Sequence, residues 1–159
     1  MIRSYKIEDL PEMISIWNEI VEEGIAFPQM ELLDEESGAQ FFASQTYCGV
    51  AQVEDEILGL YILHPNNVGR CGHIANASFA VASRSRGHHI GEQLVKDCLA
   101  QASKVGFRIL QFNAVVETNT AARRLYERLG FTPLGVIPNG FLMKSGSYAN
   151  IIPYYCELF

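Results

Sequence analysis

The residues best suited to chemistry lie between Val81 and Phe131, where a predicted strand runs through a short turn into a predicted helix. The first amides of a helix have no partner inside it, and glycine lets the backbone approach a ligand closely. Such a turn can hold a phosphate or pyrophosphate, and an arginine in it adds a charge-assisted contact. The residues that would supply these contacts are Arg86, Gly87, His88, His89, Ile90 and Gly91. This part of the sequence therefore predicts a site for a phosphorylated cofactor.

A second helix is predicted to begin at Asn119, a residue type that caps helix N-termini. Tyr126 follows seven residues later. Seven residues are close to two helical turns, so both side chains point the same way. This pair predicts polar groups that face the reactive end of the cofactor.

These residues resemble two motifs of the GCN5-related N-acetyltransferase (GNAT) superfamily. Its cofactor motif, Gln/Arg-x-x-Gly-x-Gly/Ala, is matched from Arg86 to Gly91, except that His89 stands where the middle glycine is expected. Its later motif, Asn-x-x-Ala-x-x-Leu-Tyr-x-x-x-Gly-Phe, is matched at every fixed position from Asn119 to Phe131. The resemblance implies an acetyl-CoA-dependent N-acetyltransferase of mixed α/β class, with a central sheet of about seven strands flanked by about four helices.

The resemblance also implies roles for single residues. Val81 and Ser83, at the end of the preceding strand, would hold the pantetheine arm of acetyl-CoA through backbone groups. Asn119 would cap its helix and face the cofactor, and Ala122 is small enough to let the arm pass. Tyr126 would meet the departing thiolate, because a phenol can donate a proton or a hydrogen bond to sulfur.

His89 is the one departure from the cofactor motif. A Cβ would be costly there if the position needed a positive φ. A helix start need not have a positive φ at this position, because only the amide is required. His88 and His89 would point about 100° apart on a helix and have no third ligand, so no metal site is predicted.

An acceptor amine must be neutral to attack a thioester, and an alkyl amine with a pKa of about 10 is mostly protonated at pH 7. The predicted strand at 73–82 carries no Asp or Glu that could act as a base. It carries Asn76, and the next parallel strand carries Asn113 among apolar neighbours. These amides could hold a substrate carboxylate, the acetyl oxygen or a relay water, or only satisfy nearby backbone groups. Further base candidates are Glu117, His73 and His64.

A closer resemblance narrows the predicted acceptor. Four segments look like those of the yeast acetyltransferases that detoxify azetidine-2-carboxylate, a proline analogue: His-Ile-Ala-Asn-Ala-Ser-Phe, Leu-Gln-Phe-Asn-Ala-Val-Val, Pro-Asn-Gly-Phe and Ile-Ile-Pro-Tyr-Tyr. In that subfamily, asparagines of the two strand motifs take part in substrate recognition and activation. The resemblance therefore implies that Asn76 and Asn113 bind the substrate and assist catalysis, with Asn119 beside the cofactor.

Hydrophobic periodicity and turn residues predict a single domain, residues 1–159, that positions these side chains. Helices are expected at 9–24, 34–45, 88–102 and from 119 onward, and strands at 2–7, 47–53, 57–63, 73–82, 108–116, 133–137 and 151–158. The helix between strands 73–82 and 108–116 implies a right-handed crossover and parallel pairing of these two strands. A turn is expected at 138–140, and Pro153 is expected at a sheet edge or at a bulge.

The chain of 159 residues carries a net charge of −6, and no basic patch lies away from the predicted cofactor site. We therefore expect neither nucleic acid nor an anionic membrane as partner. No apolar run approaches the ~20 residues of a membrane span, and the N-terminus shows no signal-peptide core. The four cysteines form no Cys-x-x-Cys pair, which is typical of free thiols in a reducing cytosol. The predicted location is cytoplasmic.

The predicted function is acetyl transfer from acetyl-CoA to a small amine, such as a cyclic imino acid. The amine would attack the thioester directly, and a backbone N–H near residues 78–81 would stabilise the oxyanion. Two alternatives stay open: an enzyme for protein or peptide N-termini, with the loop at 139–150 shaping an open groove, and a non-catalytic module that binds acyl-CoA. No metal is expected, and the terminal strand could complete the sheet of a second copy in a homodimer.

Overall fold

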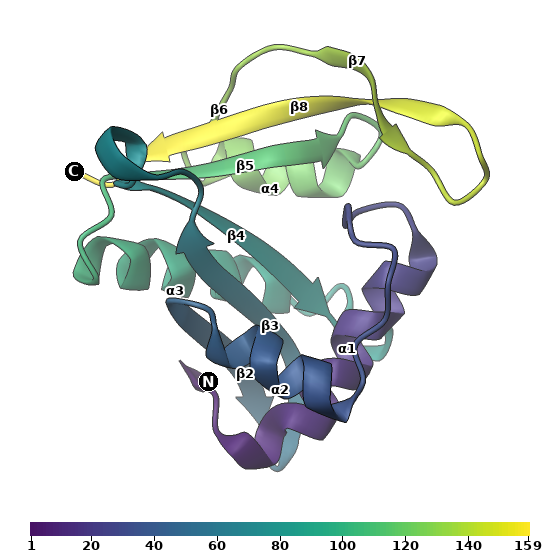
Figure 1. Ribbon diagram of the computed structural model, residues 1–159, viewed down its shortest axis with the longest axis vertical. Coiled ribbons are helices and arrows are strands. Elements are labelled where there is room, and N and C mark those ends of the chain that lie inside the picture. Colours follow the sequence, from purple (N-terminus) through teal and green to yellow (C-terminus); the bar gives the residue numbers. More distant parts are fainter.

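The computed structural model describes every residue from Met1 to Phe159. The four α-helices are α1 (Leu10–Glu23), α2 (Glu35–Ala43), α3 (Ile90–Lys104) and α4 (Thr120–Arg128). The strands are β1 (Ile2–Ser4), β2 (Tyr47–Val53), β3 (Glu56–Pro65), β4 (Ile74–Val81), β5 (Ile109–Val116), β6 (Thr132–Pro133), β7 (Ile137–Leu142) and β8 (Tyr148–Glu157). Together they form one mixed sheet with helices packed against it (Figure 1).

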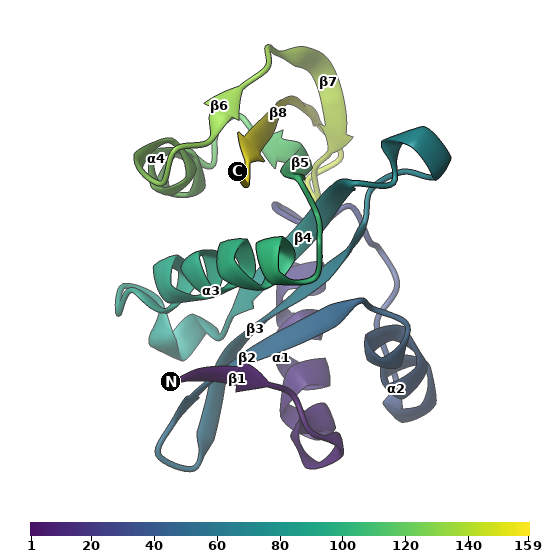
Figure 2. The same ribbon diagram turned by 90° about the vertical axis from the view of Figure 1, so that its left-hand side faces the viewer.

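The sheet runs in the order β1-β2-β3-β4-β5-β8-β6, and β7 pairs with β8. All strand pairs are antiparallel except β4 and β5, which are parallel and joined through α3. Helices α3 and α4 lie on one face, and α1 and α2 lie on the other (Figure 2). The predicted fold class is confirmed, with eight strands in the sheet.

Helix α1 carries its apolar residues at helical spacing, and Met13, Ile16 and Trp17 are buried against the sheet. The helix ends at Gly24, whose left-handed φ of 64° closes the last turn. Beyond Gly24, the ring centroid of Phe27 lies 4.5 Å from the ring centroid of Trp17. This contact holds down the loop between α1 and α2, which lies close to β4.

Helix α3 packs on the opposite face of the sheet. Its residues Leu94, Val95 and Cys98 are buried in one cluster with Leu63 of β3 and Leu110 of β5. Burying a side chain as large as leucine stabilises the fold by roughly 1.5–3 kcal/mol. This packing fixes the first turn of α3 relative to the end of β4.

Pro153 lies in β8, an interior strand, and stands opposite a β-bulge. The register of β5 against β8 shifts between Phe112 and Val115, so that Asn113 and Ala114 together face Pro153. Of the two positions predicted for Pro153, the edge is wrong and the bulge is confirmed. A proline has no N–H for the ladder, and the bulge falls where that donor is missing.

Two further local predictions differ from the structure. The turn expected at 138–140 lies inside β7, where a register shift and a left-handed Asn139 (φ 56°) bend the strand instead of ending it. The first strand is shorter than expected, because Asp9 accepts hydrogen bonds from Arg3 at 2.7 and 3.0 Å and from the Lys6 amide at 2.8 Å. These bonds pull the chain into a short 3-10 turn before α1.

Candidate active site

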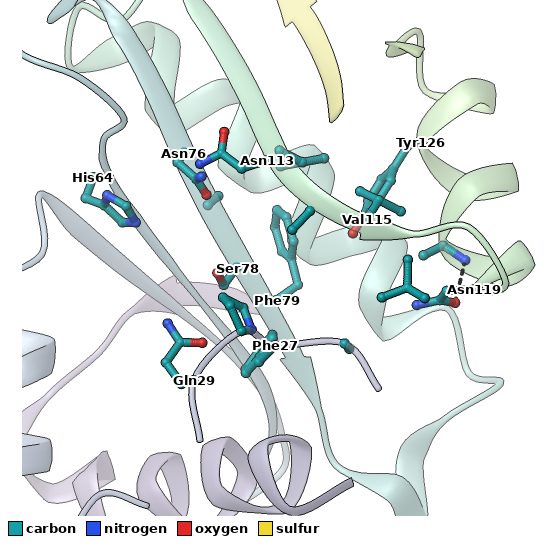
Figure 3. Close-up of a pocket in the computed structure, with 17 residues that line it drawn as sticks. Phe27, Gln29, His64, Asn76, Ser78, Phe79, Asn113, Val115, Asn119 and Tyr126 are labelled. Atoms are coloured by element: carbon teal, nitrogen blue, oxygen red, sulfur yellow. Dashed lines mark hydrogen bonds between the residues drawn. The ribbon is translucent and has the colours of Figure 1, made fainter. Parts of the chain in front are cut away.

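The candidate site begins where β4 and β5 separate. Their ladder joins only residues 74–76 to residues 109–111, and beyond it the strands diverge (Figure 3). On the other side of β4, the Ala82 N–H still donates to the Leu58 carbonyl at 2.9 Å. Because the hydrogen-bonding direction alternates along a strand, the backbone groups of Phe79 and Val81 face the opening. They have no strand partner there and can bind an extended ligand.

The turn between β4 and α3 presents unpaired amides. Gly87 has a φ of 86° and His89 a φ of 62°. No hydrogen bond within the chain uses the N–H groups of His89, Ile90 or Gly91. The expectation that His89 need not adopt a positive φ is wrong: the chain has a left-handed residue at this position where it enters α3, at a cost of roughly 1–2 kcal/mol for a residue with a Cβ.

Gly91, in the first turn of α3, is not required by packing within the chain. Its backbone is helical, and a Cβ built on it would meet only Val81 Cγ2, at an ordinary contact distance of 3.8 Å. Gly91 and Val81 both line a hollow of about 340 Å³ above the turn. The missing side chain therefore leaves room for a ligand beside the free amides.

Most of the predicted cofactor residues line this hollow: Val81, Arg86, Gly87, His89, Ile90, Gly91 and Ala122. Ser83 and His88 do not. The Ser83 amide and hydroxyl donate to the Glu19 carboxylate at 2.7 and 3.0 Å. His88 lines a separate hollow together with Arg84.

Charged side chains surround the hollow in pairs. Arg86 is bonded to Glu23 of α1, and Arg128 of α4 lies 3.3 Å from Glu92 of α3. Exposed pairs of this kind contribute about 1 kcal/mol or less, so the arginines are available to an anionic ligand. The sequence interpretation missed Arg128 and Glu92, because their contact joins two helices and no local pattern reveals it.

The start of α4 matches the prediction. The Asn119 side chain accepts a hydrogen bond from the Ala122 amide at 3.3 Å and caps the helix. Ala122 lines both the hollow above the turn and a second one between the splayed strands. A residue with a larger side chain at this point would narrow the passage between them.

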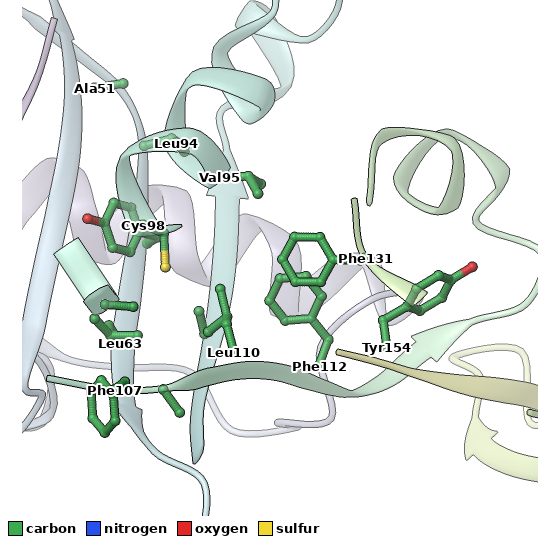
Figure 4. Close-up of a cluster of buried hydrophobic side chains, with 14 of the residues drawn as sticks. Ala51, Leu63, Leu94, Val95, Cys98, Phe107, Leu110, Phe112, Phe131 and Tyr154 are labelled. Carbon is green, nitrogen blue, oxygen red and sulfur yellow. The ribbon is translucent and has the colours of Figure 1, made fainter. Parts of the chain in front are cut away.

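Tyr126 also lines the second hollow, from the α4 side. The centroid of its ring lies 4.6 Å from that of Phe112 and 5.7 Å from that of Phe131, two members of the buried hydrophobic cluster of Figure 4. Burial, with smaller contributions from Cys98 and Tyr154, raises the pKa of Tyr126. The phenol therefore stays protonated at neutral pH and is suited to donate a proton.

Asn76 and Asn113 are brought together by a third asparagine. Asn66, at the end of β3, accepts at its Oδ1 from Asn76 Nδ2 at 3.2 Å and from Asn113 Nδ2 at 2.7 Å. Gln111 donates to Asn113 Oδ1 at 3.1 Å. Asn76 Oδ1 and one side-chain N–H of both Asn76 and Asn113 then have no hydrogen-bond partner within the chain. The sequence interpretation missed Asn66, whose position depends on the return of the chain from β3 to β4.

The second hollow has a volume of about 390 Å³ and is lined by Asn76, Asn113, Asn119, Tyr126 and the α1–α2 loop (Figure 3). No Asp, Glu, Lys or Arg lines it. Of the three further base candidates, His64 lines the hollow, whereas Glu117 and His73 do not.

Comparison with known proteins decides the family. The sequence profile of the acetyltransferase (GNAT) family matches residues 10–131. The chain belongs to the acetyltransferase (GNAT) family. A solved GCN5-related N-acetyltransferase from Kribbella flavida is 31% identical and superimposes over 99% of this chain and 96% of that chain, with a TM-score of 0.90. The predicted enzyme class, an N-acetyltransferase, is confirmed at the level of the family.

Two further proteins are similar to this chain, one in sequence and one in fold. N-acetyltransferase aca1 of Schizosaccharomyces pombe is 40% identical over 88 residues, which span 55% of this chain and 42% of that protein. The chain spans less than half the length of the curated relatives it matches. The structure of yncA from Salmonella typhimurium, which contains acetyl-CoA, shares the fold, with 18% identity and a TM-score of 0.89 over 100% of this chain and 94% of that chain. The resemblance to azetidine-2-carboxylate acetyltransferases stays a prediction.

No helix has the length and apolar character needed to span a membrane. No three or more His, Cys, Asp or Glu side chains are grouped so that they could hold a metal ion.

Proposed function

We propose that the protein transfers the acetyl group of acetyl-CoA to the amine nitrogen of a small molecule. The observation that carries this proposal is the meeting of two hollows at Ala122, between the splayed strands β4 and β5. One hollow offers free amides and the other offers asparagines and a phenol. A ligand with a phosphorylated end and a long arm would reach from the first to the second.

The first hollow suits the pyrophosphate of acetyl-CoA. The free amides at the start of α3 add to the positive end of the helix dipole, which favours an anion. Arg86 and Arg128 supply positive charge at its rim. The unpaired carbonyl of Phe79 and the backbone groups of Val81 would hydrogen-bond the amides of the pantetheine arm, and Gly91 leaves space for it.

The second hollow would hold the thioester and the acceptor. The nitrogen lone pair attacks the carbonyl carbon, and the C–S bond breaks as the amide forms. The Phe79 N–H, on the open edge of β4, would stabilise the oxyanion, as preorganised donors do in other acyl transfers. Tyr126 would donate a proton to the departing thiolate, because its raised pKa keeps the phenol protonated.

The acceptor that we propose is small and carries a carboxylate beside its amine, as azetidine-2-carboxylate does. The free N–H groups of Asn76 and Asn113 suit a carboxylate, and Asn76 Oδ1 suits an amine N–H. A hollow of about 390 Å³ covered by Phe27 and its loop favours a free small molecule over a peptide chain.

The test is thiol release from acetyl-CoA with a panel of acceptors: azetidine-2-carboxylate, proline, a polyamine, an aminoglycoside and a short peptide. We expect release with the imino acids, reduced in Asn76→Ala and Asn113→Ala. Asn67→Ala, an exposed asparagine in the next turn, is the matched control and should behave as wild type. Release with the peptide alone would favour an N-terminal peptide acetyltransferase. Acetyl-CoA binding without release for any amine would favour a non-catalytic acyl-CoA sensor.

A further inference from the structure

The hollow that we assign to the acceptor contains one side chain able to take up a proton near neutral pH. His64 lies at the end of β3, directly opposite Asn76 in the β3–β4 ladder, and lines the hollow beside it (Figure 3). Glu117 is engaged elsewhere, since its carboxylate accepts from Asn150 Nδ2 at 3.1 Å. His73 is exposed in the loop before β4.

A hydrogen bond fixes which nitrogen of His64 carries the proton. Nδ1 lies 2.9 Å from the carbonyl oxygen of Pro65. A carbonyl can only accept, so Nδ1 must be the donor. In the neutral ring, Nε2 then keeps its lone pair and can accept a proton. The Pro65 carbonyl also holds the ring in one orientation.

Few groups around His64 could act as a base in its place. The lining residues of β4, β5, α4 and the α1–α2 loop include no Asp, Glu, Lys or Arg, and Tyr126 is the other titratable group among them. Tyr126 stays protonated, because burial raises its pKa. The β3–β4 connection carries Arg70 and His73, which are exposed and line no part of the hollow.

We propose that His64 Nε2 is the general base that deprotonates the acceptor ammonium, directly or through one water. This proposal rests on the acetyl transfer proposed above. It answers a requirement of that reaction, because roughly one alkyl amine in a thousand or fewer is neutral at pH 7.

The proposed reaction begins with a proton transfer to His64. Nε2 takes one proton from the ammonium, and the nitrogen lone pair that is freed forms the N–C bond. The C–S bond breaks, and the sulfur receives a proton from Tyr126, which regains one from the nitrogen that has attacked. The products are the acetylated amine, CoA with a free thiol, and imidazolium at His64, which returns its proton to water.

The experiment compares His64→Gln and His64→Ala with wild type in acceptor-dependent thiol release between pH 5.5 and pH 9. Glutamine can still donate to the Pro65 carbonyl but cannot act as a base. His73→Gln is the matched control, a histidine of the adjoining loop outside the hollow. Thermal unfolding and acetyl-CoA affinity are measured on every variant, so that a loss of folding is recognised.

We expect kcat/KM at pH 7 to fall about 10²–10⁴-fold in both His64 variants, the range of a general base. In wild type the rate should rise with pH less steeply than the fraction of neutral amine does. In both variants the rate should instead rise with the fraction of neutral amine. The difference in kcat/KM between wild type and the two variants should become smaller toward pH 9, and added imidazole should restore part of the rate of His64→Ala.

A His64→Gln enzyme with the wild-type rate and pH profile would overturn the proposal. An equal loss of kcat/KM at all pH values in the His64 variants, without rescue by imidazole, would also overturn the proposal and indicate a structural role. If wild type itself releases no thiol with any amine, the proposed acetyl transfer fails rather than the assignment of the base.

Discussion

Substitutions at Gly91 should separate cofactor binding from the stability of the fold. The backbone at Gly91 is helical, and an added Cβ would meet only Val81 Cγ2, at 3.8 Å. Alanine is preferred over glycine in a helix by about 0.5–1 kcal/mol. For a chain of this length, that gain corresponds to a rise of about 1–4 °C in Tm.

A side chain larger than a methyl group should weaken acetyl-CoA binding. Gly91 and Val81 line the hollow above the turn, so the branched side chain of valine takes up space beside the free amides. Charge-assisted hydrogen bonds are worth about 1.5–3 kcal/mol each, and displacing one of them is enough for a tenfold loss, about 1.4 kcal/mol. We expect the Kd for acetyl-CoA to rise at least about tenfold in Gly91→Val, whereas Gly91→Ala should bind nearly as well as wild type, because the cofactor motif has Gly or Ala at this position.

The assay is isothermal titration calorimetry with acetyl-CoA, paired with thermal unfolding of the ligand-free protein. Gln93→Ala is the matched control, because Gln93 lies in the same part of α3 but lines a different hollow. A Gly91→Val variant that is as stable as wild type and binds acetyl-CoA with unchanged Kd would refute the placement of the cofactor.

Three further predictions follow from single contacts. Tyr126→Phe keeps the ring packed on the aromatic cluster but removes the proton donor, so kcat should fall by about 10²-fold with little change in acetyl-CoA affinity. Asn66→Ala removes two hydrogen bonds of about 0.5–1.5 kcal/mol each that position Asn76 and Asn113, so Tm should fall by about 2–12 °C and KM for the acceptor should rise roughly tenfold. Asp9→Asn removes the carboxylate charge that faces the partly buried Arg3 and should lower the free energy of unfolding by about 1–3 kcal/mol at pH 7, measured by urea titration.

The pH dependence of the last variant has a defined sign. The hydrogen bonds from Arg3 lower the pKa of the Asp9 carboxyl, so its contribution is present above the unfolded-state pKa of about 3.9 and is lost as pH falls below it. The wild type should therefore lose more stability than Asp9→Asn between pH 5 and pH 2.5. Parallel acid unfolding curves for the two proteins would show that the ion pair does not stabilise the fold.

For Tyr126→Phe, an unchanged kcat would remove the phenol from the mechanism.

Local signals in the sequence predicted much of the fold. Gly24 ends α1 and Asn119 caps α4 as their residue types indicate, because a cap depends on atoms within one helical turn. The parallel pairing of β4 and β5 follows from the helix between them. Val81, Gly91 and Ala122 line the predicted cofactor site. Their positions could be predicted because Val81 and Gly91 belong to one strand–helix unit and Ala122 belongs to the helix that follows.

What the sequence did not predict depends on contacts between distant segments. Asn66 joins the two site asparagines only because β3 returns beside β4 and β5. The left-handed φ of His89 runs against the preference of its residue type, so local propensity did not predict it. The turn signal at 138–140 became a bend within β7, because pairing with β8 outweighs the tendency of Pro-Asn-Gly to form a turn.

Transfer of acetyl from acetyl-CoA to a small amine can be measured through both of its products. The protein is incubated with acetyl-CoA labelled in the acetyl group and with azetidine-2-carboxylate or proline, and both free CoA thiol and labelled amide are quantified. We expect equal amounts of the two products, formed only when protein and acceptor are both present. Tight binding of acetyl-CoA without labelled amide from any amine would contradict the proposed acetyl transfer.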